Sequence, residues 1–206
     1  MIVKDVSFGD SARADLVDGI NILANAVKST LGARGQTVLI ESEHHTRGIT
    51  VTKDGVTVAN SINLMHPTQN LAVRMMKEAA DNTATSAGDG TTTAIVLAQA
   101  IILEAMDRLK PHMSIIEVLR GIRLMSKRVV ELLEGKSKKV SGRRLLDVAT
   151  VSSNNDQELG KIISDAYSEV GADGVVTVEN SSGVETFSEI ILGMKVIENV
   201  KSKDMW

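Results

Sequence analysis

The sequence predicts a mostly α-helical protein with small β elements, in which a helical domain is followed by a small α+β module. Apolar residues recur at helical spacing over several long segments. Only two prolines, Pro67 and Pro111, interrupt the chain, and this scarcity suits long helices. The runs that read as strands are short, and turn-forming residues bound them.

The composition narrows the class of protein. Hydrophobic residues make up 43% of the 206 positions but aromatic residues only 2%, so Val, Ile, Leu, Ala and Met must build the core. The net charge of −3 argues against a general nucleic-acid binder, and the lack of cysteine excludes disulfides and thiolate metal sites. The N-terminus lacks a signal-peptide pattern and no apolar run approaches membrane-spanning length, so we expect a soluble, cytoplasmic protein.

The first domain opens with a helix and a hairpin. The helix covers about residues 10–31 and ends at Gly32, because glycine readily adopts the left-handed conformation that terminates helices. Residues 37–41 and 49–52 read as short strands, joined by the polar loop 42–47. The apolar positions of the helix share one face: Leu16, Ile20, Leu23, Val27 and Leu31.

Three further helices complete this domain. One runs from Pro67 to about residue 85, and the next follows three consecutive threonines and continues to about residue 109. The last begins at Ser114, which forms a capping-box pattern with Glu117, and fades at Gly135.

The pattern changes after the charged stretch 135–139, which reads as a crossing between domains. A short helix over 145–150 and a second around 159–166 precede two strands, 174–179 and 185–192. The expected division of the chain is therefore a helical domain over 1–135, an α+β module over 136–193 and a tail over 194–206.

The most informative segment is Gly88-Asp-Gly-Thr-Thr-Thr93, directly before the apolar helical run 94–103. Three β-branched threonines begin a helix poorly on propensity alone. They make sense if their hydroxyls and backbone N–H groups face an anion at the positive end of that helix. Asp89 would repel a phosphate unless a hard cation such as Mg²⁺ lay between them. The segment therefore predicts a site for a metal-bound nucleotide phosphate.

Two other glycine-containing loops, residues 30–35 and 52–56, also lie at element boundaries. Each alone is weak evidence, since glycine ends helices and Asp-Gly makes turns for ordinary reasons. Together with 88–93 they supply backbone that can cradle phosphates and two carboxylates. The P-loop pattern and the strand-preceded Gly-x-Gly-x-x-Gly pattern are both absent, so ATP would be bound in neither of those folds.

Five blocks of the chain, in collinear order, resemble group I (GroEL-type) chaperonins. The resemblance extends from about Lys4 to Met194. The blocks are residues 27–35, 49–56, 88–101, 148–156 and 170–179. The resemblance implies that residues 1–135 form the N-terminal half of an equatorial-type ATP-binding domain. It implies that residues 136–193 form an intermediate-type module.

The resemblance also implies roles for individual residues. Asp89 would hold Mg²⁺, and Asp54 would be the catalytic residue that orients the attacking water, with K⁺ as an accessory ion. The implied nucleotide and phosphate contacts are Thr30, Leu31, Gly32, Lys53, Gly55, Gly90, Thr91, Thr92 and Thr93. These roles agree with the chemistry of phosphoryl transfer, which needs positioning and charge neutralisation more than covalent help.

Two positions depart from the family pattern. Ala33 stands where the family usually has proline, which leaves that loop less rigid. His44 and His45 lie in a polar hairpin loop, where solvated side chains are the expectation rather than a metal pair.

The end of the chain shapes the functional expectation. Family members continue past Gly193 into an apical domain that binds unfolded polypeptide, whereas residues 194–206 do not resemble it. We therefore expect a truncated chaperonin-like ATP-binding protein that assists folding with a complementary chain, contacts unfolded polypeptide only indirectly and turns over little ATP alone. The alternative is a non-catalytic, ring-forming element that co-assembles with itself or with full-length chaperonin. Neither reading involves nucleic acid or a membrane.

Overall fold

The computed structural model describes residues 6–32, 34–41, 48–110, 112–171, 174–181, 183, 185–191 and 193. The chain divides into two compact units, residues 1–125 and 126–206, each of which is described by itself. The division falls inside α5 (Ile115–Lys136), ten residues before the boundary expected at residue 135. Across the described residues the chain is mostly helical, so the predicted fold class is confirmed.

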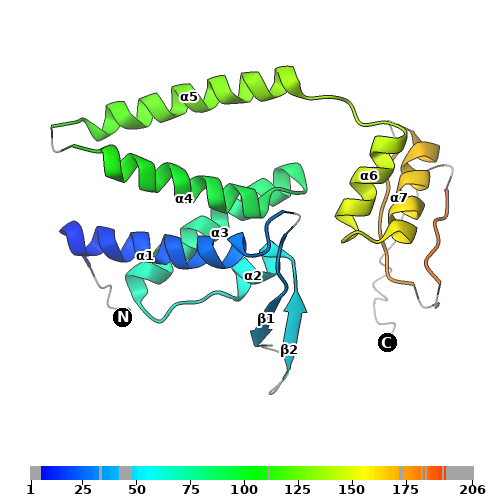
Figure 1. Cartoon of the computed structure of the whole chain (residues 1–206), viewed down its shortest axis with the longest axis horizontal. Helices are drawn as coiled ribbons and strands as arrows, with labels where there is room; N and C mark the ends of the chain where they lie inside the picture. The colour runs from blue at the N-terminus through cyan, green and yellow to red at the C-terminus, as the bar shows by residue number, and fades with distance from the viewer. Residues whose placement is uncertain are drawn as a thin grey trace, which may run out of the picture. The chain divides into compact units, whose positions relative to one another are not determined.

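The first unit is built on three packed helices, α1 (Gly9–Lys28), α3 (Pro67–Ala87) and α4 (Thr91–Arg108) (Figure 1). Their facing sides form one apolar core in which Leu23, Val27 and Val73 are fully buried. α1 and α3 approach closely at Gly19, where any Cβ would overlap the backbone of Gln69. The helical spacing of apolar residues in α1 therefore places its predicted face in the core.

A two-stranded antiparallel hairpin, β1 (Val38–Glu41) and β2 (Ile49–Thr52), projects from the helices (Figure 1). Val38 and Ile40 pack against the core, whereas the opposite face is exposed. Both strands agree with the prediction to within a residue, and the loop holding His44 and His45 lies outside the described residues.

The sequence analysis missed a short helix, α2 (Gly55–Ser61), directly after β2. Asp54 caps its N-terminus, and Val58 and Ala59 are buried in the core. The signal was present, because aspartate followed by helix-compatible residues is an N-cap pattern. The prediction over residues 52–56 is a turn or a phosphate-binding loop, and it does not include a helix.

The second unit contains the helix pair α6 (Arg143–Ser152) and α7 (Gln157–Val170), both close to prediction. Asn154 and Asn155 reverse the chain between them with φ of 56° and 66°, a conformation that asparagine tolerates better than most residues. The helices cross closely at Gly160, where a Cβ would lie 2.5 Å from Thr150 Oγ1.

The two strands expected after α7 are not formed in the described residues 174–181 and 185–191. Val175 and Val178 are 83% and 89% exposed, so these two apolar side chains are not packed against a partner. A strand is stable only when its backbone pairs with a neighbour, and an isolated pair is marginal. Local β propensity was therefore not sufficient to form these strands.

Candidate functional site

The three glycine-containing loops of the sequence analysis meet at Gly55. A Cβ on Gly55 would overlap Oγ1 of Thr92 and lie 3.1 Å from Oγ1 of Thr30. One hydroxyl comes from the loop after α1 and the other from the first turn of α4. The structure thus brings together one residue from each predicted loop, and only glycine fits at their meeting point.

The loop after α1 is held by its own hydrogen bonds. Thr30 Oγ1 donates to the Val27 carbonyl at 2.8 Å, and Gln36 N donates to the Ser29 carbonyl at 2.7 Å. α1 ends at Lys28 with Ser29 as its C-cap, three residues before the predicted end, so Gly32 (φ +75°) turns the loop and does not stop the helix. Because the Thr30 hydroxyl already donates, its oxygen faces the site as an acceptor.

The loop between α3 and α4 turns on two glycines. Gly88 (φ 74°) ends α3, and Gly90 (φ 89°) stands at the N-cap of α4 without a side chain to cap it. The first N–H groups of α4 therefore have no side-chain acceptor, which leaves them available to an anion at the positive end of the helix.

The three threonines that open α4 face different directions. Thr91 is buried, Thr92 is half-buried and Thr93 is exposed. The Thr92 side chain faces Gly55, so the three hydroxyls do not form a single row. Backbone N–H groups of the first turn are the donors that these residues have in common.

Asp89 is the predicted metal ligand, and it is exposed at the start of this turn. Its Oδ1 accepts a hydrogen bond from Gly90 N at 2.6 Å. The described residues contain no group of three or more His, Asp or Glu side chains that could hold a metal ion. A lone carboxylate does fit Mg²⁺, which is commonly bound by one or two carboxylates together with substrate phosphates and water.

Asp54, the predicted catalytic residue, caps α2. Oδ1 accepts from Val56 N at 3.2 Å, and Oδ2 accepts from Thr57 N at 2.9 Å and Thr57 Oγ1 at 2.7 Å. Partial burial raises the pKa of the Asp54 carboxyl, but the Thr57 and Val56 hydrogen bonds outweigh it and lower the pKa below the ordinary value. Asp54 is therefore ionised at neutral pH and is suited to orienting a group rather than to accepting its proton.

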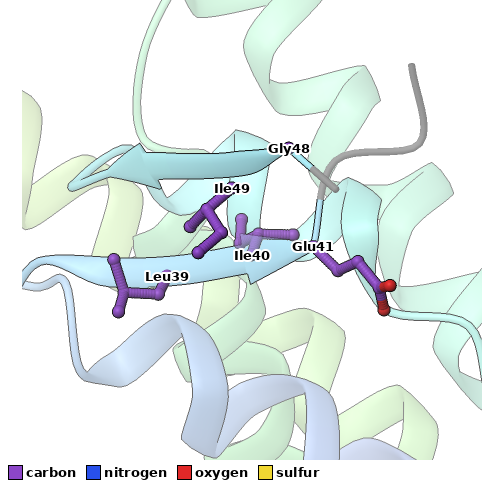
Figure 2. Close-up of a pocket in the computed structure, with 5 residues that line it drawn as sticks. All are labelled: Leu39, Ile40, Glu41, Gly48 and Ile49. Carbon is purple, nitrogen blue, oxygen red and sulfur yellow. The ribbon is translucent and has the colours of Figure 1, made fainter. Parts of the chain in front are cut away.

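Leu31, Gly32 and Lys53 are exposed around the meeting point, whereas Gly55 is buried. A shallow hollow lies elsewhere, on the hairpin, and is lined by Leu39, Ile40, Glu41, Gly48 and Ile49 (Figure 2). None of the predicted site residues lines it. With four uncharged residues and one carboxylate, it has no chemistry suited to a phosphate.

A sequence model of the TCP-1/cpn60 chaperonin family matches residues 23–206. The chain belongs to this chaperonin family. The match includes all three loops and continues through residues 194–206, which the sequence analysis had set apart as a tail.

Solved chaperonin structures share the fold. The chaperonin gp146 from the bacteriophage EL 2 (Pseudomonas aeruginosa), crystallised in the presence of ATP-BeFx, is 33% identical over 78% of this chain, with a TM-score of 0.68. A group III chaperonin in the open state is 25% identical over 80% of it, with a TM-score of 0.64. This chain spans 28% and 33% of their lengths. No helix in the described part of this chaperonin is both long and apolar enough to cross a bilayer.

Proposed function

We propose that the first unit of this chaperonin binds ATP together with Mg²⁺. The observation that carries the proposal is the convergence of Thr30, Gly55 and Thr92 from three separate loops beside the uncapped start of α4. The gp146 crystals that contained ATP-BeFx support it, because that protein shares the fold.

The proposed roles follow the geometry. The first N–H groups of α4, at Thr91–Thr93, and Gly90 bind phosphate oxygens, with Lys53 and Gly55 alongside. Asp89 holds Mg²⁺, which neutralises phosphate charge when bound. Asp54, ionised and fixed by its cap hydrogen bonds, orients the attacking water. The loop 30–32 contacts the rest of the nucleotide, and K⁺ is the accessory cation.

We further propose a role in ATP-dependent protein folding, as a group I-type subunit in the cytoplasm that acts in an oligomeric ring with a complementary chain. Membership of the chaperonin family supports this proposal, and the matched part of the chain covers 28% and 33% of the two solved chaperonins.

A second candidate is a non-catalytic element that co-assembles with full-length chaperonin. The state of α5 favours it, because none of its described residues is buried, and Met125, Val129 and Leu133, which share one face, are 49–61% exposed. An apolar helix face of this size is typical of an interaction surface. Sedimentation with and without full-length chaperonin tests insertion, and a strictly monomeric species in both samples would exclude it.

The first proposal is tested by Asp89→Ala. Calorimetric titration with Mg²⁺·ATP should show binding weakened by about tenfold or more, since the lost carboxylate holds the metal. Binding of ATP in EDTA should be unaffected. Asp81→Ala, an exposed aspartate within α3, is the matched control and should bind like the unaltered chain. Equal Mg²⁺·ATP affinities for both variants would remove Asp89 from the site.

A further inference from the structure

A polar side chain lies buried in the otherwise apolar contact between α1 and α4. Gln99 is only 3% exposed, and its neighbours along that face of α4 are Ile95 and Ile102. A buried amide costs free energy unless both its carbonyl and its NH₂ group are hydrogen-bonded. Both groups of the Gln99 amide therefore need hydrogen-bond partners within the protein.

Gln99 bonds to two residues of α1 at once. Lys28 Nζ donates to Gln99 Oε1 at 2.5 Å, and Gln99 Nε2 donates to Asn21 Oδ1 at 2.6 Å. The orientation of the amide is fixed by chemistry, since an ammonium can only donate. Asn21 and Lys28 lie two turns apart on one face of α1. We call these three side chains the Gln99 bridge.

The bridge sets how far α1 and α4 are shifted along each other. Sliding one helix by a single residue moves it about 1.5 Å. That shift would take at least one of the two bonds out of hydrogen-bonding range. Interdigitated apolar side chains also resist sliding, but the two hydrogen bonds define the position more narrowly, because they depend on both distance and angle.

Both helix ends that the bridge aligns carry site residues. Thr30 follows two residues after Lys28, the last residue of α1. Thr92 lies two turns before Gln99 on the same face of α4. The alignment therefore determines whether the Thr30 and Thr92 hydroxyls meet at Gly55.

We propose that Gln99 is a positioning residue of the nucleotide site, acting through Lys28 and Asn21 to hold the ends of α1 and α4 in register. This inference rests on the proposed ATP-binding function. It assigns to a buried residue outside the three loops a part in their geometry.

The test compares three variants of the full chain by calorimetric titration with Mg²⁺·ATP. Gln99→Leu should weaken binding about tenfold or more, since displacements near 1 Å at a site have effects of this size. Val73→Ala, a fully buried position in α3, is a destabilised control that should retain affinity within about twofold, because it leaves the bridge intact.

The triple variant Asn21→Leu/Lys28→Met/Gln99→Leu separates positioning from stability. In Gln99→Leu water can solvate the exposed Lys28 ammonium but reaches the half-buried Asn21 amide less well, so replacing both partners should recover the part of the unfolding free energy that is lost at Asn21. It should not restore nucleotide affinity. Recovery of affinity along with stability would overturn the proposal.

A nucleotide-free measurement keeps the inference distinct from the proposed function. The chain has no cysteine, so Thr30→Cys/Thr92→Cys introduces the only two thiols, which a short bifunctional thiol reagent can link. Adding Gln99→Leu should slow linkage several-fold, and adding Val73→Ala should not. Equal rates would refute the bridge even if nucleotide binds. A chain that binds no Mg²⁺·ATP but shows the slowed linkage would refute only the proposed function.

Discussion

Helices α1 and α5 are similar in sequence pattern and opposite in environment. Both are long and amphipathic, with apolar residues at helical spacing. α1 buries five residues, with Leu23 and Val27 fully covered, whereas α5 buries none of its described residues. Amphipathicity thus predicts that a helix has an apolar face, but it does not say what covers that face.

The largest expected effect is on stability, and it tests the difference between the buried face of α1 and the exposed face of α5. Leu23→Ala in α1 should lower the free energy of unfolding by about 3 kcal/mol, because it opens a cavity in a packed core. Leu132→Ala in α5 deletes the same atoms at a position that is 66% exposed and should change it by about 0.5 kcal/mol or less. Urea unfolding followed by circular dichroism measures both. A large cost at Leu132 would mean that α5 is covered in solution.

A second pair of substitutions compares a glycine at a close helix crossing with a glycine on an uncovered helix. Gly160→Ala in α7 would place a Cβ 2.5–2.8 Å from atoms of Thr150, two of them backbone, and should destabilise the second unit by about 2 kcal/mol. Gly121→Ala in α5 meets nothing within 4 Å and should stabilise its helix by about 0.5–1 kcal/mol.

The only tyrosine in the chain, Tyr167 in α7, provides a local probe for the second unit. Its fluorescence should report earlier unfolding in Gly160→Ala than in the unaltered chain. If Gly160→Ala stabilised the second unit as Gly121→Ala is expected to stabilise its helix, the close crossing of α6 and α7 would not exist in solution.

The same contrast explains what the sequence could predict. The α1, α3 and α4 helices and the hairpin were predictable because their pattern and their partners lie within one unit. The strands expected over 174–179 and 185–192 failed because Val175 and Val178 have the propensity but no neighbouring strand among the described residues. Periodicity describes one element, whereas pairing depends on two.

The candidate site was predictable to a different degree. Local loop chemistry and the family resemblance identified Thr30, Gly55 and Thr92 as site residues, and the structure brings them together. Their roles in nucleotide binding stay predictions. The Gln99 bridge could not be found from sequence, because a glutamine in an apolar helical run carries no signal of its two partners on α1.

The smallest effect concerns Asp54, where the packed core meets the exposed rim of the site. Asp54→Ala removes the cap of α2 and should cost about 1 kcal/mol. Asp54→Asn should cost less, since asparagine also caps helices well.

The pH dependence separates the two Asp54 variants. The pKa of Asp54 is lowered in the folded chain, so its ionised form stabilises the fold above the unfolded pKa, and that contribution disappears as pH falls through the folded value. The unaltered chain should therefore lose stability between about pH 4 and pH 2 more steeply than Asp54→Asn, which has no proton to take up there. Urea midpoints measured across this range for both chains give the slopes. Parallel slopes would mean that the Thr57 and Val56 hydrogen bonds do not favour the carboxylate, and the case for an ionised, water-orienting Asp54 would lose its electrostatic basis.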